Sequence, residues 1–242
     1  MISIVVAYFE REKQLLRTLE SFKQYDPGDF NVVIVDNGSK EDLILPKLPY
    51  EVKQVKLTGM PGHCVFTYNA GFLESLDSDI IIMQGAECCH QGNVIEYAKR
   101  VTDSTYISFG CYSLSEKETP ETVVINNRCQ TFDGDSAWYN HPVYNGRGLN
   151  FCSAITTKNI IKLNGFDERF GYGCAYEDDY LLHQISMLGL TVEITADPFV
   201  FHQWHPMMGN RSEESWEKNL NLFNELSQSK EFRSKHILTL DL

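Results

Sequence analysis

Three acidic residues in a row, Glu177, Asp178 and Asp179, stand at the start of a segment with helical spacing. A helix N-terminus favours acidic side chains on electrostatic grounds, which accounts for one or two of the three. It does not account for the glycine-rich stretch at 165–173 that precedes them. A carboxylate held among like charges is well suited to accept a proton from an attacking hydroxyl. The segment is therefore a candidate for general-base chemistry.

A further carboxylate, Glu87, comes after an apolar run at 80–83 that is typical of a buried strand. At the carboxyl end of such a strand it is well placed to bind a divalent cation. Two alternatives stay open on this segment alone: Glu87 caps a helix that begins near Gly92, or it faces solvent. We assign the neighbouring Cys88 and Cys89 to packing, because a structural zinc site needs further Cys or His residues at ligand spacing.

Two histidines, His202 and His205, lie three positions apart after the apolar residues at 198–201. In an extended strand their side chains would point to opposite faces, so both can reach one site only if the strand has already turned. A lone histidine is more often structural, but the neighbouring Trp204 and His205 favour a functional interpretation. We expect one of the two histidines to be a metal ligand.

A fourth polar cluster, at 36–39, follows the apolar run at 31–35. Open α/β sheets bind ligands beyond the carboxyl ends of their strands, and an amide or carboxylate there can pair with the edge of a base. The alternative is a simple turn, because Asn-Gly and Ser form turns in any loop. Taken alone, this cluster favours the turn.

The elements that must position these side chains alternate between apolar runs and helical spacing. Strands are expected at 1–9, 31–35, 52–57 and 79–83, and helices at 12–25 and 67–76. Nearly continuous apolar runs are typical of parallel strands that helices cover on both faces. This alternation, maintained for about a hundred residues, predicts a doubly wound α/β sheet.

The pattern loosens between 102 and 150, into short strand candidates at 106–109 and 122–125. The polar and glycine-rich stretches between them are where substrate loops would lie. Beyond them, helices are expected at 157–163, about 177–188 and 212 to about 226, and a strand at 191–195. A chain of 242 residues without internal repeats fits one domain.

Composition narrows the choice of partners. The formal net charge of −12 argues against a nucleic-acid partner, although a divalent cation, a helix N-terminus or a few basic side chains can still hold a diphosphate. Seven cysteines without an even framework fit a reducing, cytoplasmic setting. The apolar start at 1–9 is too short for a transmembrane segment, and we interpret it as a strand, not a signal peptide. Peripheral attachment to a membrane stays open.

Taken together, and in chain order over about residues 2–205, these motifs resemble the GT-A glycosyltransferases. The resemblance is to family 2 in particular, and to relatives with a galactosyltransferase-like carboxyl half. It implies a Rossmann-like, mostly parallel sheet flanked by helices, in one domain over 1–242. It also implies a nucleotide-sugar-binding half at about 1–100 and an acceptor-binding, catalytic half at about 101–242.

The resemblance assigns the donor and metal sites. The nucleotide-sugar would contact Ala7, Tyr8, Glu10, Asp36, Asn37 and Asn69. The family commonly has Arg-Asn where this chain has Tyr68-Asn69. Its metal motif is usually Asp-x-Asp, whereas Gln84-Gly85-Ala86-Glu87 occupies that place and keeps a single carboxylate. The implied ligands of Mn²⁺ or Mg²⁺ are Glu87 with His202 as first choice and His205 as second.

By the same resemblance Asp178 is the catalytic base, and the acceptor would contact Glu177, Asp179, Trp138, His141 and Arg147. The implied reaction moves a sugar, with inversion, from a nucleotide-sugar such as a UDP-sugar to a hydroxyl of a glycan, lipid-linked or protein acceptor. One alternative is a nucleotidyltransferase, although residues 8–12 lack the glycines of a phosphate-binding loop. Another is a non-catalytic carbohydrate-binding relative, suggested by the incomplete metal motif.

Overall fold

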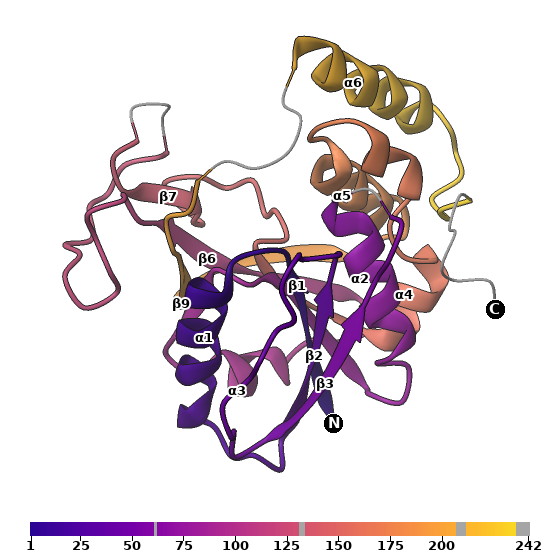
Figure 1. Ribbon diagram of the computed structural model, residues 1–242. Coiled ribbons are helices and arrows are strands. Elements are labelled where there is room, and N and C mark those ends of the chain that lie inside the picture. The colour runs from indigo at the N-terminus through magenta and orange to yellow at the C-terminus, as the bar shows by residue number, and fades with distance from the viewer. Residues whose placement is uncertain (61, 131–133, 207–211, 236–242) are drawn as a thin grey trace.

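A computed structural model of the chain describes residues 1–60, 62–130, 134–206 and 212–235. Within these residues nine strands form one continuous sheet with helices on both faces (Figure 1). The strands are β1 (Ile2–Tyr8), β2 (Phe30–Asp36), β3 (Glu51–Lys56), β4 (Ile80–Gly85), β5 (Cys88–Gln91), β6 (Thr105–Ser113), β7 (Ala137–Asn140), β8 (Cys152–Thr156) and β9 (Thr191–His202). The α-helices are α1 (Glu12–Ser21), α2 (Cys64–Leu73), α3 (Val94–Ala98), α4 (Thr157–Leu163), α5 (Glu177–Met187) and α6 (Glu213–Ser227). Two 3₁₀ segments, Phe22–Gln24 and Glu168–Tyr172, extend α1 and precede α5.

The amino-terminal half of the sheet is parallel, in the strand order β3-β2-β1-β4. β1 lies at its centre, with Ile2 opposite Phe30 of β2 and Ile80 of β4. Because successive side chains of a strand point to opposite faces, Ile4 packs in one core and Val5 in the other. The apolar runs in the sequence are thus strands buried on both faces, as predicted.

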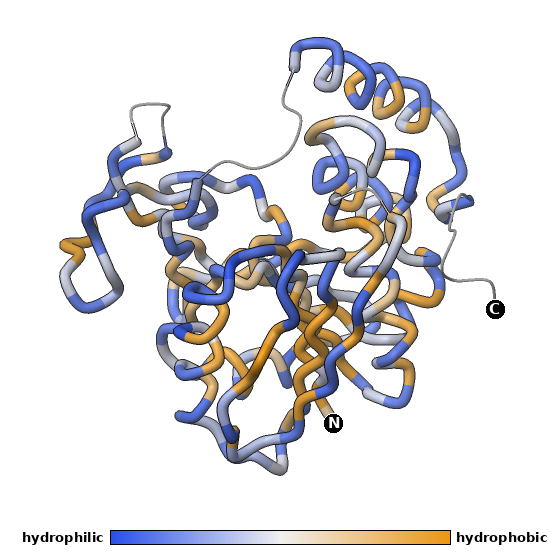
Figure 2. The backbone as a smooth tube through the Cα atoms, viewed as in Figure 1, coloured by the Kyte–Doolittle hydropathy of each residue, from blue (hydrophilic) through white to orange (hydrophobic). Residues whose placement is uncertain are grey.

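Each face of the sheet has its own helices and its own hydrophobic core. Leu15 and Leu19 of α1 and Val94 of α3 belong to one core. Phe66 of α2 belongs to the other, with apolar residues of α4 and α5. Figure 2 shows hydrophobic stretches concentrated along the central strands. The two-sided burial confirms the predicted α/β class.

The carboxyl half of the sheet departs from the predicted, mostly parallel arrangement. β8 pairs antiparallel with both β4 and β6, and β9 returns parallel to β6. β5 and β7 pair antiparallel with β9 and β6, so the sheet is mixed. Only residues 86 and 87 separate β4 from β5, yet β5 is the last strand in the order β3-β2-β1-β4-β8-β6-β9-β5. The sheet must therefore curl back on itself, and residues 86–87 lie where it does so.

The strand predicted at 122–125 is wrong, since the structure has irregular backbone there. Val124 is 83% exposed and belongs to no strand ladder. Its β-branched neighbours favour extended backbone, but a strand also needs a paired partner. Conversely, β5, β7 and β8 were not predicted, and β9 continues past the predicted range of 191–195 to His202.

The cysteines and the helices bear on two further expectations. All seven cysteines are free thiols, in line with their irregular spacing in the sequence. In the part of the chain that the structure describes, no helix combines the length and the apolar character needed to cross a bilayer.

Helix α2 lies close to β1 at Gly71, where an added Cβ would lie 2.2 Å from Val5 Cγ1. We expect Gly71→Ala to lower the free energy of unfolding by about 1–3 kcal/mol, because Val5 or the helix must shift. Urea denaturation measures this change. Gly146→Ala, where nothing lies within 4 Å of the added Cβ, is the control and should change it by less than about 0.5 kcal/mol. Equal stability of the two variants would contradict the close approach.

Candidate active site

A cavity of about 890 Å³ opens beyond the carboxyl ends of β1 and β2. Its lining includes Tyr8 from β1, Asn37 directly after β2, the segment 171–179 that leads into α5, and Trp216 of α6. Open α/β sheets bind ligands at this edge. The volume falls within the range of about 300–1,000 Å³ that is typical of small-molecule sites.

Asp178 lies in the first turn of α5 and lines this cavity. Burial, followed by the negative charges of Glu177 and Asp179, raises the pKa of Asp178 well above its usual value, while Arg147 acts in the opposite direction. With its amide nitrogen facing this carboxylate, Asn150 donates to Asp178 Oδ2 at 3.1 Å and also to Oδ1. Asp178 therefore combines high proton affinity with a fixed orientation, as a general base requires.

The glycine-rich approach to α5 is explained by close packing. A Cβ added at Gly171 would lie 2.3 Å from Phe66 of α2, and one at Gly173 would lie 2.0 Å from Asn219 of α6. The Asn219 amide donates to the carbonyl of Ala175 at 2.8 Å, and Ala175 has the left-handed φ of 62°. Such a φ is costly outside glycine and persists where neighbours hold it. Helix α6 thus fixes the loop that presents Asp178.

Glu87 lies in the turn between β4 and β5, and only 7% of its surface is exposed. Its Oε1 is 2.9 Å from Arg11 Nη1, 3.3 Å from His202 Nε2 and 3.8 Å from His205 Nε2. A Cβ at Gly85 would lie 2.7 Å from the same oxygen, so glycine leaves room for the carboxylate to fold back. The predicted metal ligands Glu87, His202 and His205 therefore converge, and Glu87 neither caps a helix nor faces solvent.

The electrostatics of this cluster suit a cation. Burial alone would raise the pKa of Glu87, but the hydrogen bond with His202 and the charge of Arg11 outweigh it and lower the pKa. Burial lowers the pKa of His205 to about 4. An ionised carboxylate and a neutral imidazole are the forms that bind metal ions. Glu87 Oε2 is buried without a hydrogen-bond partner, so a ligand atom remains available.

Backbone pairing explains why these residues meet. In the antiparallel pair of β5 and β9, Cys88 lies opposite His202, and Gln203 N donates to Glu87 O at 3.0 Å. The strand ends at His202, so His205 comes from the loop beyond it and reaches the same side. Cys88 is buried in the core, as predicted.

Arg11 and Asn150 are two site residues that the sequence did not indicate. Arg11 contacts Glu87 and also lines the cavity that contains Asp178. In the sequence, Arg11 is one of several charged residues that follow the apolar run at 1–9. Asn150, next to Asp178, stood in a stretch without periodicity. Arg11 therefore connects the cavity to the Glu87 cluster, whose three members are not themselves lining residues.

The predicted donor-binding residues divide into two groups. Three of them line the cavity: Ala7, Tyr8 and Asn37. Asp36 is buried, and its Oδ1 accepts hydrogen bonds from the backbone N and the Oγ of Ser39, at 2.9 and 2.6 Å. Glu10 is exposed, and its backbone N donates to Ser39 Oγ at 3.0 Å. Asp36 thus shapes the turn after β2 and is not part of the lining.

Three other predicted contacts are not brought to the cavity. The Asn69 amide donates to the carbonyl of Phe166 at 2.9 Å and joins α2 to the loop before α5. Trp138 Nε1 donates to the carbonyl of Asn126 at 3.0 Å within a separate hydrophobic cluster. The His141 ring packs against Trp138 at an interplanar angle of 48°, with ring centroids 4.4 Å apart. Burial and satisfied hydrogen bonds give these side chains structural roles.

The remaining predicted acceptor contacts, Glu177, Asp179 and Arg147, do line the cavity. Arg147 Nη2 lies 3.2 Å from Asp179 Oδ1, so this acid has a positive partner. Glu177 faces His63 and Cys64 instead. The two acids that flank Asp178 therefore have different surroundings.

The raised pKa of Asp178 predicts a stability change. Between the unfolded and the folded pKa the native state binds more protons, so Asp178 lowers stability increasingly as pH rises. We expect Asp178→Asn to raise the melting temperature at pH 7–8, with the gain vanishing below about pH 4, where the unfolded carboxyl is also protonated. Thermal melts across pH measure this. The exposed Asp77→Asn is the control, and a lower melting temperature for Asp178→Asn at every pH would contradict the expectation.

Comparisons with known proteins agree with this architecture. Residues 3–49 match the family model described as glycosyl transferase family 2. A search of curated proteins found no match. The solved structure of S. aureus TarS 1–349 is similar, with a TM-score of 0.63 and 13% identity over 92% of this chain and 64% of that one.

A second similar structure is the mannosyltransferase PcManGT from Pyrobaculum calidifontis, in complex with GDP-Man and Mn²⁺. Its TM-score is 0.55, with 13% identity over 89% of this chain and 59% of that one. The chain thus spans about 64% and 59% of the lengths of these two structures. It has the GT-A fold of glycosyltransferases, which confirms the fold predicted from the sequence. The galactosyltransferase-like carboxyl half stays a prediction.

Proposed function

On the premise of the GT-A fold, we propose that this chain is a glycosyltransferase that moves one sugar from a nucleotide-sugar to an acceptor hydroxyl. The observation that carries the proposal is that Asp178 and Arg11, the partner of Glu87, line one cavity. The family match at residues 3–49 supports it. We favour a UDP-sugar as donor, because the S. aureus TarS neighbour was solved with UDP and with UDP-GlcNAc.

In the proposed reaction the two halves of the chain divide the work. The donor lies against Ala7, Tyr8 and Asn37, in the half that spans about residues 1–100. The hydroxyl oxygen of the acceptor attacks the anomeric carbon of the donor sugar while Asp178 accepts the hydroxyl proton. Because this is a direct displacement of the diphosphate, the configuration at the anomeric carbon inverts. Asn150 holds the carboxylate in place by donating to both of its oxygens.

The leaving diphosphate needs positive charge. Arg11 supplies one guanidinium at the cavity wall. Glu87, His202 and His205 would hold a divalent cation, which would supply Lewis acidity to offset the negative charge of the leaving group. Two imidazoles beside one carboxylate favour Mn²⁺ over Mg²⁺, which prefers oxygen ligands throughout. Glu177, Asp179 and Arg147 orient the hydroxyls of a glycan, lipid-linked or protein acceptor.

The proposed base gives a direct test. Asp178→Asn should lower kcat by about 10²–10⁴-fold, because the amide cannot take the acceptor proton. UDP binding, measured by calorimetry, should stay nearly unchanged, since donor contacts lie elsewhere. A thermal-shift screen of nucleotide-sugars with Mn²⁺ first identifies the donor, because a ligand stabilises the state that it binds. Turnover retained by the variant would remove Asp178 from this role.

Arg11 and a cation compete for the same carboxylate, which predicts the effect of Arg11→Gln. Removing this positive charge should tighten Mn²⁺ binding by about tenfold. The corresponding free energy is only a fraction of the Coulomb energy of two unit charges about 4 Å apart near a protein surface. Titration followed by the electron paramagnetic resonance of free Mn²⁺ measures it. Lys13→Gln, an exposed change on the same helix, is the control. Unchanged or weaker Mn²⁺ binding in Arg11→Gln would mean that the cation does not use Glu87.

A further inference from the structure

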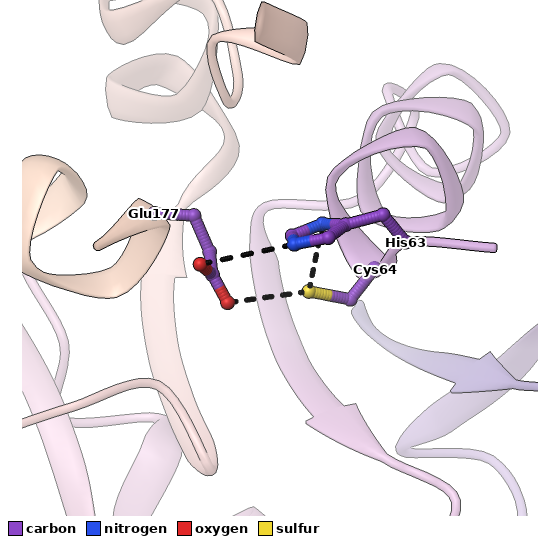
Figure 3. A group of neighbouring side chains, drawn as sticks. All are labelled: His63, Cys64 and Glu177. Carbon is purple, nitrogen blue, oxygen red and sulfur yellow. Dashed lines mark hydrogen bonds and ion pairs between the residues drawn. The ribbon is translucent and has the colours of Figure 1, made fainter. Parts of the chain in front are cut away.

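A second group of metal-binding side chains lines the same cavity: His63, Cys64 and Glu177 (Figure 3). His63 and Cys64 stand at the start of α2, and Glu177 is the first residue of α5. Cys64 Sγ lies 3.7 Å from Glu177 Oε1 and 3.7 Å from His63 Nδ1. His63 Nε2 lies 3.9 Å from Glu177 Oε2. Segments distant in the chain thus present sulfur, nitrogen and oxygen to one point.

These separations are somewhat wider than those around a bound ion. Zinc bonds of about 2.3 Å to sulfur and about 2.0–2.2 Å to nitrogen and oxygen, at tetrahedral angles, place ligand atoms roughly 3.3–3.7 Å apart. With one ligand atom taken from each residue, the three atoms lie within 4.8 Å of one another, so they would have to move inward by about 1 Å to share an ion. Independently, Glu177 Oε2 is buried without a hydrogen-bond partner, so this oxygen has the capacity to bind an ion.

We propose that His63, Cys64 and Glu177 form a second cation site, which binds a thiophilic divalent ion of the Zn²⁺ class. The thiolate distinguishes this group from the Glu87 cluster, which contains no sulfur, because soft thiolate ligands favour Zn²⁺ over Mn²⁺. Three protein ligands leave a fourth position open. Because all three residues line the cavity, that position faces the space in which substrates would bind.

A Cys-His pair can also act as a nucleophile, but this role requires a thiolate. Burial, followed by the negative charges of Glu177 and Asp178, raises the pKa of the Cys64 thiol well above its usual value. Without a cation nearby the thiol therefore stays protonated at neutral pH. A bound divalent ion reverses the local charge and deprotonates a coordinating thiol. The surroundings thus disfavour a role of Cys64 as a free nucleophile, and the proposed site depends on the convergence of the three side chains.

The ion would act on the site beside it. It joins the start of α2 to the start of α5, one residue before Asp178. It also takes the Glu177 carboxylate away from the acceptor and places positive charge next to the base. We expect this ion to inhibit sugar transfer; this consequence rests on the proposed function, whereas the site itself does not.

Cobalt spectroscopy tests the site without any assay of activity. One equivalent of Co²⁺ added to the full chain should give a sulfur-to-cobalt charge-transfer band, and Zn²⁺ should displace it. Cys64→Ser should lack the band, and the exposed Cys129→Ser should keep it. Glu177→Gln keeps the thiol and should weaken Co²⁺ binding by about tenfold or more. No band in the unsubstituted chain, or a band that survives Cys64→Ser, would overturn the proposal.

Two further measurements separate folding and function from metal binding. Zn²⁺ should raise the melting temperature of the unsubstituted chain and of Cys129→Ser more than that of Cys64→Ser, which keeps only the Glu87 cluster and whose melt also shows whether it folds. With Mn²⁺ in large excess to saturate the Glu87 cluster, one equivalent of Zn²⁺ should lower the transfer rate about tenfold or more. Under the same conditions the rate of Cys64→Ser should stay at its own zinc-free value. A chain that transfers no sugar under any condition would refute the proposed function, while the cobalt band still decides the second site.

Discussion

The structure depends on how the negative charge of one buried carboxylate, that of Glu87, is compensated. Removing an ion from water costs several kcal/mol, so the nearly inaccessible Glu87 must gain positive or hydrogen-bonding partners. They come from distant parts of the chain: Arg11 directly before α1, His202 at the end of β9 and His205 in the loop beyond. These contacts hold the first β-α unit against the carboxyl end of β9. The same contacts bring together the proposed metal ligands.

The carboxylate of Asp178 has surroundings of the opposite charge. Its neighbours Glu177 and Asp179 are acids, and the one opposing charge, Arg147, is paired with Asp179. The protein thus lowers the pKa of Glu87 and raises that of Asp178, although Arg11, the partner of Glu87, lines the cavity that contains Asp178. Two carboxylates whose environments push their pKa values apart can divide the roles of cation ligand and proton acceptor.

Much of the fold and part of the site could be predicted from the sequence. β1, β2 and β4 are buried on both faces, so their composition alone reveals them. β5 contains two cysteines, a histidine and a glutamine, and it is a strand only because β9, about a hundred residues later, pairs with it. Glu87, His202 and Asp178 could be selected as candidates because their residue types and positions suit their chemistry. The sequence could not show that Trp138 lies away from the cavity, because it does not reveal that the indole N–H has a partner inside the protein.

The ladder between β5 and β9 has a thermodynamic consequence for ion binding. Cys88 lies opposite His202, and Gln203 is bonded to the carbonyl of Glu87, so backbone hydrogen bonds already fix two ligands next to each other. Little conformational entropy is then left to lose when an ion arrives. If an ion binds here, its occupancy should depend on the ion concentration and on the displacement of Arg11 from Glu87, while the rest of the fold stays unchanged. The competing guanidinium of Arg11 would then set the ion concentration at which the site is half occupied.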